Sequence, residues 1–171
     1  MEWIQTYTGV PFWPLAPKME DIRIEDIAHS LSMQCRFNGH CTTFYSVAEH
    51  SVRVSKIVPP EHALWGLLHD AGEAYLTDLP RPVKSQMERF RDLEDIVLQK
   101  VMEKYGLSWP MPEPVHHADM VMLETERRDL MRPCTTPWSI DVEPLKDIIA
   151  PLSQQEAKEL FLKRFQELCT K

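Results

Sequence analysis

The sequence predicts an all-α protein, and three features of its 171 residues support that prediction. Apolar side chains recur at the three- and four-residue spacing of amphipathic helices over most of the chain. No segment shows the alternation of a convincing strand, and only 5 glycines stand against 14 prolines, whereas a β-rich fold uses glycine in its turns. We therefore expect a bundle of about six helices joined by connections that contain proline.

The chain begins with a segment, residues 1–20, that is expected to be irregular, because residues 9–17 match neither a helical nor a strand period. Its aromatic residues indicate that it lies across the body of the protein. Residues 21–171 are expected to form a single helical bundle domain, long enough to build a core without disulfide or metal staples. The first helix of that domain is predicted within residues 21–35.

The second and third helices are separated by a pair of prolines. Thr42 or Thr43 is expected to cap the second helix, which ends at about Val58. The third helix is expected to begin at Pro60 and to continue to about Ala71.

Three further helices complete the predicted bundle. A proline-bounded loop over residues 76–82 leads to a long amphipathic helix over residues 85–105, which Gly106 is expected to close. The next helix is expected over about residues 113–131 and is followed by a proline-rich connection over residues 133–144.

The last helix carries a clear start signal. Ser153 is followed three residues later by Glu156 and then by an apolar run, which is the pattern of a capping box. We therefore expect this helix to begin directly after Ser153.

The charge balance argues against stable nucleic-acid binding. The chain has 19 Lys and Arg against 26 Asp and Glu, a net charge of −7, and it shows no basic stripe. There is no secretory signal at the start and no apolar run that approaches a membrane span, so we expect no membrane association. The cysteine spacings match neither a zinc ribbon nor a disulfide framework, which predicts reduced thiols and a cytoplasmic protein; they are Cys35, Cys41, Cys134 and Cys169.

Ionisable residues are expected to point into the core from three helices. His50 shares a helical stripe with valines, Asp119 lies among apolar residues at helical spacing, and His69-Asp70 follows the apolar stretch 63–68. Each taken alone is more simply a satisfied core histidine or a carboxylate at a helix end. If all of these groups were buried without partners, each would cost several kcal/mol of folding free energy, about 3–5 for a buried charge that lacks its partner.

A shared divalent cation would compensate all of these groups at once, and the sequence shows no other evident partner for them. Two imidazoles and two carboxylates suit Mn²⁺, Fe²⁺, Co²⁺, Ni²⁺ or Zn²⁺, and Mg²⁺ is possible. Four protein ligands on an octahedral ion leave positions open for water or substrate. The sequence therefore predicts one metal site, with the ligands His50, His69, Asp70 and Asp119.

At this point the sequence resembles the HD-domain metal-dependent phosphohydrolases. The resemblance is greatest to compact bacterial 5′-deoxynucleotidases and to phage deoxynucleoside triphosphohydrolases that act on dATP. It spans about residues 36–119, half of the chain, and rests on four motifs in order: VAEHS at 47–51, HDAGE at 69–73, LTDLPRPVK at 76–84 and AD at 118–119.

The resemblance implies the same four metal ligands and two further catalytic residues. Glu73 lies four residues after His69, one helical turn on, and is expected to orient or deprotonate the attacking water; otherwise it is a solvated helix glutamate. Asp78 matches a loop aspartate that contacts substrate and protonates the leaving sugar oxygen, although Thr-Asp-Leu-Pro is also a good turn.

The resemblance also implies a substrate-binding surface. Arg36 matches an arginine that clamps the phosphate, as its planar guanidinium is well suited to do, and is expected to act in catalysis. Phe37 stands where the nucleotidase pattern has tryptophan, which leaves the substrate preference open. The other candidates belong to the loop and its end, where Lys84 is more simply a surface lysine: Leu79, Pro80, Arg81 and Lys84.

The resemblance implies hydrolysis of a 2′-deoxynucleotide. We expect release of phosphate from deoxynucleoside 5′-monophosphates, with release of triphosphate from a deoxynucleoside triphosphate such as dATP as the alternative. A metal or nucleotide sensor without catalysis, and a structural helical adaptor, are the rival classes. A homodimer or larger homo-oligomer is expected, for which aromatic residues of the first segment are candidate contacts, unless they wrap their own domain: Trp3, Tyr7, Phe12 and Trp13.

Overall fold

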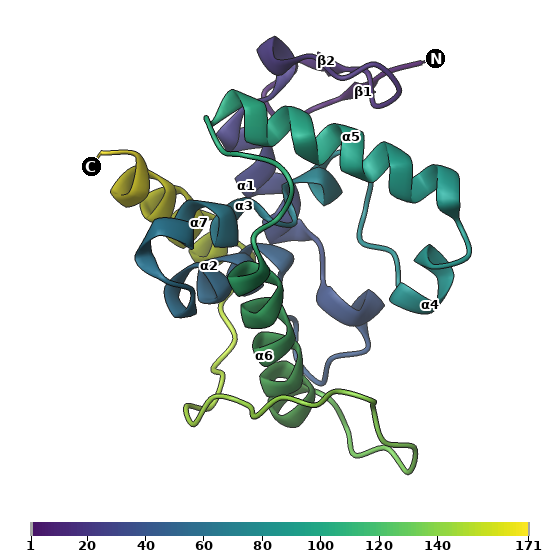
Figure 1. The fold of residues 1–171 in the computed structure, drawn as a ribbon, viewed down its shortest axis with the longest axis vertical. Helices are drawn as coiled ribbons and strands as arrows, with labels where there is room; N and C mark the ends of the chain where they lie inside the picture. The colour runs from purple at the N-terminus through teal and green to yellow at the C-terminus, as the bar shows by residue number, and fades with distance from the viewer. Residues whose placement is uncertain (1, 171) are drawn as a thin grey trace.

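The computed structural model describes residues 2–170, and within them the fold is an all-α bundle, as predicted. Figure 1 shows the long helix α5 crossing the upper part of the molecule, below the strands β1 and β2, and α6 running down through the lower middle. Seven α-helices lie within the described residues: α1 (Ile24–Met33), α2 (Val47–Ile57), α3 (Ala63–Leu68), α4 (Arg81–Lys84), α5 (Glu88–Lys104), α6 (Glu113–Leu130) and α7 (Gln154–Cys169).

Helix α2 occupies the centre of the bundle, because it packs against α1, α3, α6 and α7. Helix α3 approaches α2 closely at Gly66, where an added Cβ would lie 3.1 Å from the Cα atom of Ser55. Only glycine permits this separation without displacing the backbone of α2. The close packing brings His50, on α2, next to His69, directly after α3.

Two of the predicted helix signals, the capping box and the closing glycine, are confirmed, and the predicted cap of the second helix is not. Ser153 and Glu156 form the capping box in both directions. Gly106 follows α5 with a φ of 70°, the left-handed backbone that glycine adopts without strain. The predicted cap of the second helix was wrong, since the hydroxyl of Ser46, rather than Thr42 or Thr43, accepts from the backbone N–H of Glu49.

The first segment is less irregular than predicted. Its two short strands, β1 (Ile4–Gln5) and β2 (Pro11–Phe12), pair in an antiparallel hairpin, so the expectation of no strand was wrong. The strands are too short for an alternation pattern to appear in the sequence. Phe12 is fully buried and stacks on Tyr75 at 4.0 Å, so this aromatic residue wraps its own domain.

The third predicted helix is shorter than expected at both ends, because Pro60–His62 forms a 3₁₀ turn and α3 runs only from Ala63 to Leu68. A separate 3₁₀ turn, Ala71–Ala74, follows, with Asp70 before it. The short helix α4, at the end of the proline-bounded loop, is the seventh that the prediction of about six did not include. Pro82 lies within its first turn, where proline is tolerated because the first N–H groups have no helical partner.

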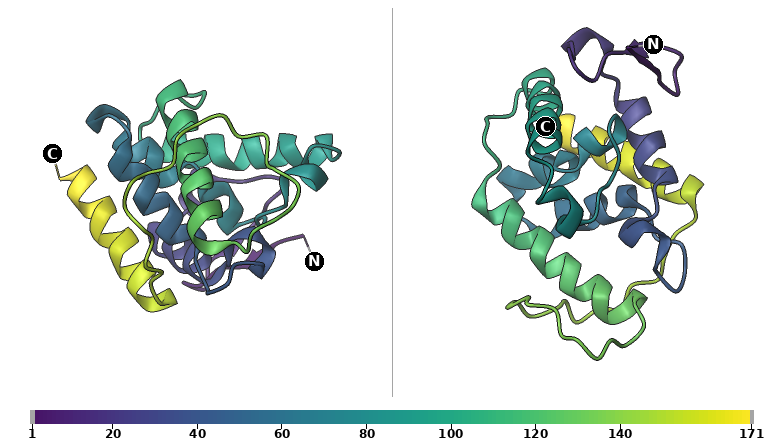
Figure 2. Two further views of the ribbon diagram at one scale, coloured as in Figure 1. Left: turned by 90° about the horizontal axis from the view of Figure 1, so that it is seen from below. Right: turned by 90° about the vertical axis from the view of Figure 1, so that its right-hand side faces the viewer.

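The connection between α6 and α7 passes around the C-terminal part of α6 (Figure 2). Thr125 and Asp129 of α6 accept hydrogen bonds from the backbone of Leu145 and Ile149 in this connection. At the end of the connection, just before α7, the backbone N–H of Leu152 donates to the buried carboxylate of Glu49, on α2, at 2.8 Å. None of the helices within residues 2–170 has the length and the apolarity that a membrane crossing requires.

Candidate metal centre

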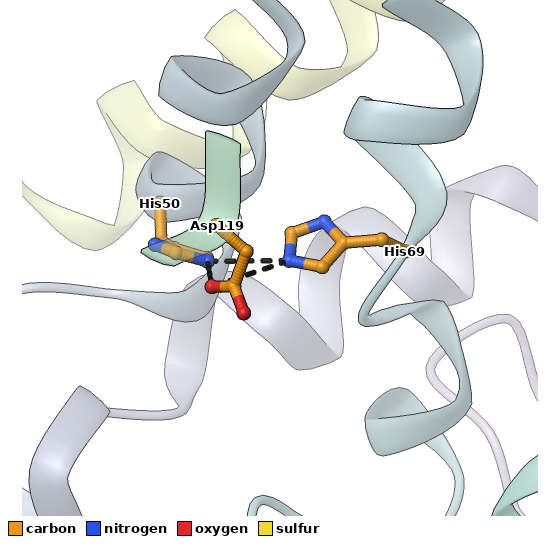
Figure 3. Close-up of side chains that lie close together, drawn as sticks. All are labelled: His50, His69 and Asp119. Carbon is orange, nitrogen blue, oxygen red and sulfur yellow. Dashed lines mark hydrogen bonds and ion pairs between the residues drawn. The ribbon is translucent and has the colours of Figure 1, made fainter. Parts of the chain in front are cut away.

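Two histidines and an aspartate from three elements converge on one point (Figure 3). The Nε2 atom of His50 lies 3.2 Å from the Nε2 atom of His69 and 3.2 Å from the Oδ1 atom of Asp119. The Nε2 atom of His69 lies 4.0 Å from the same oxygen. One ligand atom from each residue therefore falls within 4.8 Å of the others, an arrangement that can hold a metal ion.

The two imidazole rings are held so that their Nε2 atoms face each other. His50 Nδ1 lies 2.6 Å from a carboxylate oxygen of Glu126, and His69 Nδ1 lies 2.9 Å from the carbonyl oxygen of Gly66. Both oxygens only accept, so both Nδ1 atoms carry a proton. In the neutral rings the Nε2 lone pairs then oppose each other across 3.2 Å, a contact that a cation would convert from repulsion to attraction.

Asp70, the fourth predicted ligand, lies beside this group. Its Oδ2 atom lies 3.3 Å from His69 Nε2 and 3.6 Å from His50 Nε2. With Asp119, the site offers two nitrogens and two carboxylates, a donor set that fits a divalent transition metal. The two histidines are almost fully buried while the aspartates are partly exposed, so the site is open toward solvent on the carboxylate side.

The expectation that these ligands have no partner other than a cation was wrong. The buried carboxylate of Glu126 holds His50, and Arg36 lies beside both Glu126 and Asp70. Even so, one guanidinium faces the three carboxylates of Asp70, Asp119 and Glu126, which leaves two negative charges when both histidines are neutral. A divalent cation would balance them.

The same excess of negative charge shifts the pKa values of His50 and Asp119. Burial and the charge of Arg36 lower the pKa of His50, but the carboxylates of Glu126 and Asp119 outweigh them and raise it to about 9. Burial raises the pKa of Asp119, but the hydrogen bond to His50 and the positive charges of His50, His69 and Arg36 together hold that pKa well below its usual range. A proton on His50 thus occupies the position that a cation would take.

Glu73 is buried in the 3₁₀ turn that follows α3, so it does not continue the helix of His69 as the spacing predicted. Its Oε1 atom lies 3.5 Å from Lys84 Nζ, and its Oε2 atom has no hydrogen-bond partner within residues 2–170. Burial, together with Asp70 and Asp78, raises the pKa of Glu73 well above its usual value. A buried carboxylate with a free oxygen is suited to exchange a proton with a water molecule.

Gln34, directly after α1, ties Glu73 to Asp78, a link that the sequence did not indicate. Its side-chain amide donates to the carbonyl oxygen of Glu73 at 3.1 Å and accepts from the backbone N–H of Asp78 at 3.1 Å. Burial raises the pKa of Asp78, which favours its protonated form. Gln34 therefore sets the loop of Asp78 against the turn of Glu73.

The remaining loop candidates divide between half-buried and exposed residues. Leu79 and Pro80 are half-buried, and Arg81 is exposed, with its guanidinium 3.8 Å from the sulfur of Met120. The interpretation of Lys84 as a plain surface lysine was wrong, because its Nζ donates to Glu94 at 2.7 Å and pairs with Glu73.

Arg36 and Phe37 adjoin the centre. The Nε and one terminal nitrogen of Arg36 bind Glu126 at 3.1 and 3.0 Å. Among residues 2–170, the other terminal nitrogen makes only a long ion pair, at 3.8 Å, with Asp70. Phe37 has a positive φ of 54°, and its ring lies 6.0 Å from that of Trp138, in the connection before α7. Nothing in the sequence pointed to Trp138, since 101 residues separate it from Phe37.

Comparison with known proteins assigns the chain to a family. No family model matches the chain. An uncharacterized protein of Escherichia coli (strain K12), YfdR, is 41% identical over 171 residues, which cover 98% of this chain and 96% of YfdR. This all-α protein with a candidate His–Asp metal centre therefore belongs to the same family as YfdR. An uncharacterized protein of Rhodobacter capsulatus is 36% identical over 126 residues, or 68% of this chain and 64% of its own length.

Proposed function

We propose that this protein is a divalent-metal-dependent phosphohydrolase of the HD-domain type that acts on 2′-deoxynucleotides. The observation that carries the proposal is the pair of opposed Nε2 atoms of His50 and His69, 3.2 Å apart, next to two carboxylates. The motifs at 47–51, 69–73, 76–84 and 118–119, which resemble that superfamily, support the choice of reaction.

His50, His69, Asp70 and Asp119 would hold the cation. A divalent cation bound there would polarise a phosphoryl oxygen and make water more acidic. The protein's own contribution is to fix these ligands and to supply groups that bind the phosphate and move protons.

Proton transfer falls to two acids, the buried Glu73 and the half-buried Asp78. The oxygen of a water attacks phosphorus while Glu73, through its unpartnered Oε2, accepts the proton that the water loses. The bond from phosphorus to the 5′ oxygen of the sugar breaks, and that oxygen takes its proton from Asp78, whose pKa is raised by burial. Lys84 pairs with Glu73 and limits the rise of its pKa.

Phosphate binding falls to Arg36. The terminal nitrogen of Arg36 that does not bind Glu126 has N–H groups to donate to an anionic oxygen, and only about a tenth of the side chain is exposed. In a chain of net charge −7, this guanidinium and the cation together supply the local attraction for a nucleotide. Two contacts stay predictions: Phe37 with the nucleoside, and the exposed Arg81 with the outer phosphates.

The test is a metal analysis followed by a product assay. The purified protein would be loaded with Mn²⁺, Co²⁺, Mg²⁺ or Zn²⁺, incubated with each deoxynucleoside mono- and triphosphate, and the products separated by chromatography. Nucleoside and orthophosphate from monophosphates are expected; free triphosphate would instead identify a triphosphohydrolase with the same ligands. Asp119→Asn should lose both metal and turnover, whereas His116→Ala, an exposed histidine of the same helix, should keep both.

Metal without turnover on any of these substrates would indicate a sensor, and the absence of both would refute the centre itself. Self-association of the protein also stays a prediction, which light scattering on the eluting peak of a sizing column would measure.

A further inference from the structure

Glu126 is a fully buried carboxylate whose two oxygens are both occupied by side chains around the centre. Its Oε1 atom accepts from His50 Nδ1 at 2.6 Å and from the hydroxyl of Tyr45 at 2.9 Å. Its Oε2 atom accepts from Arg36 Nε at 3.1 Å and from a terminal nitrogen of Arg36 at 3.0 Å. Because each oxygen of Glu126 already accepts from two donors in the interior, Glu126 is not placed to bind a substrate. It can act only by holding His50, Tyr45 and Arg36.

The position of Glu126 follows from the helix that carries it. Glu126 lies seven residues after Asp119 on α6, and seven residues are two turns of an α-helix. One face of α6 therefore presents Asp119 to the Nε2 side of the His50 ring and Glu126 to its Nδ1 side. The imidazole is held at both nitrogens by a single rigid element.

The two histidines are held by partners of different charge. His69 donates its Nδ1 proton to the neutral carbonyl oxygen of Gly66, whereas His50 donates to an ionised carboxylate. A carboxylate partner makes the opposite ring nitrogen more basic and fixes the ring orientation more strongly than a carbonyl does. Arg36 binds the other oxygen of Glu126 through two nitrogens and supplies the positive charge that stabilises the ionised form of that carboxylate.

We propose that Glu126 is the positioning residue of the metal centre: by accepting from His50 Nδ1 and from Arg36 at once, it aims His50 Nε2 at the cation and sets Arg36 beside Asp70. The inference rests on the metal centre proposed above but not on the identity of the substrate. Arg36 then has two functions: Nε and one terminal nitrogen bind Glu126, and the other terminal nitrogen, near Asp70, is left for the phosphate.

The test is metal affinity, measured with Co²⁺ alone in the absence of any nucleotide. Titration followed by the visible absorption of bound Co²⁺ should show Glu126→Gln binding about 10–100-fold more weakly than the wild type, with an altered spectrum. Tyr45→Phe, which removes another donor to the same oxygen and leaves the charge in place, should bind Co²⁺ within a few-fold of the wild type.

A second variant separates positioning from folding, because Glu126 also neutralises Arg36 in the interior. Glu126→Asp keeps the negative charge beside Arg36 and shortens the side chain by one methylene, so it should stay folded and still bind Co²⁺ more weakly. In the zinc-loaded protein, nitrogen-15 spectra of the histidine rings should show His50 protonated at Nδ1 in the wild type, and this signal should be lost or shifted in Glu126→Asp.

Equal Co²⁺ affinities and unchanged His50 ring signals in folded Glu126 variants would overturn the positioning role and leave the proposed function intact. A wild-type protein that binds no divalent metal would overturn both. Weaker Co²⁺ binding by the Glu126 variants, together with no nucleotide hydrolysis by the wild type, would support the positioning role and reject the proposed reaction.

Discussion

The Nε2 atoms of His50 and His69 oppose each other at 3.2 Å, because each ring has its Nδ1 atom bound to an oxygen that only accepts. The two rings come from the packing of α2 against α3, which Gly66 permits. Two neutral imidazoles in this arrangement repel each other through their Nε2 lone pairs. A positive charge bound between these two atoms would therefore stabilise the folded protein.

Divalent metal should therefore raise the stability of the protein. At a free metal concentration 100 times the dissociation constant, binding to the folded state alone adds about 2.7 kcal/mol to the free energy of unfolding. In a domain of this size the midpoint of thermal unfolding should rise by about 5–10 °C. Thermal denaturation with Co²⁺ or with a chelator measures the shift, which Asp119→Asn should lose. An unchanged midpoint at saturating metal would contradict the site.

Glu73→Gln should keep the metal and lose turnover. The glutamine has the size of the buried glutamate but cannot accept a proton from water, so kcat should fall by about 10²–10⁴-fold. Metal content by mass spectrometry and steady-state kinetics give the two readouts. A variant that hydrolyses nucleotides at the wild-type rate would remove Glu73 from the proposed mechanism.

Lys84→Met should move the pH dependence of the reaction. Burial raises the pKa of Glu73 and the charge of Lys84 lowers it, so removing that charge raises the pKa further. Glu73 must be ionised to accept a proton, and the acidic limb of kcat/KM should therefore shift to higher pH, with little change well above the new pKa. The pH profiles of wild type and variant measure this. Arg81→Met, which removes an exposed cation from the same short helix, is the control and should leave the limb in place.

Gly66→Ala should destabilise the contact between α2 and α3. The new Cβ would lie 3.1 Å from Ser55 Cα and 3.2 Å from a methyl group of Val58, and the first of these is backbone that cannot rotate away. We expect a loss of about 1–3 kcal/mol in the free energy of unfolding, measured by urea denaturation. Lys56→Ala, at an exposed position of α2, should change it by less than about 0.5 kcal/mol. A loss no larger than that of Lys56→Ala would show that the two helices separate easily.

Cysteine reactivity should distinguish Cys41 from Cys134. Burial and the neighbouring Cys35 raise the pKa of the Cys41 thiol to about 12, so almost none of it is thiolate at pH 8, while Cys134 is exposed. Iodoacetamide labelling followed by mass spectrometry should modify Cys134 faster than Cys41 in the native protein. Equal labelling rates in the native protein would contradict the half-buried environment and the raised pKa of Cys41.

Much of the fold was predictable because helix signals act within a few residues along the chain. The spacing of apolar residues indicated the helices, and Ser153 with Glu156 marked the start of α7. Where an element is no longer than about one helical turn, prediction failed: the two-residue strands of the hairpin, the four-residue helix α4 and the end of α3 before Asp70 have no periodicity to detect.

The residue types of the centre were likewise evident from the sequence, as histidines and aspartates at apolar positions of predicted helices. What only the tertiary structure decided is which groups they meet. Glu126 could have been noticed two turns after Asp119, but its pairing with Arg36, 90 residues away, could not. The free energy of a buried charge depends on neighbours brought together by packing, and for Arg36, Lys84 and Glu73 those neighbours come from separate elements of the chain.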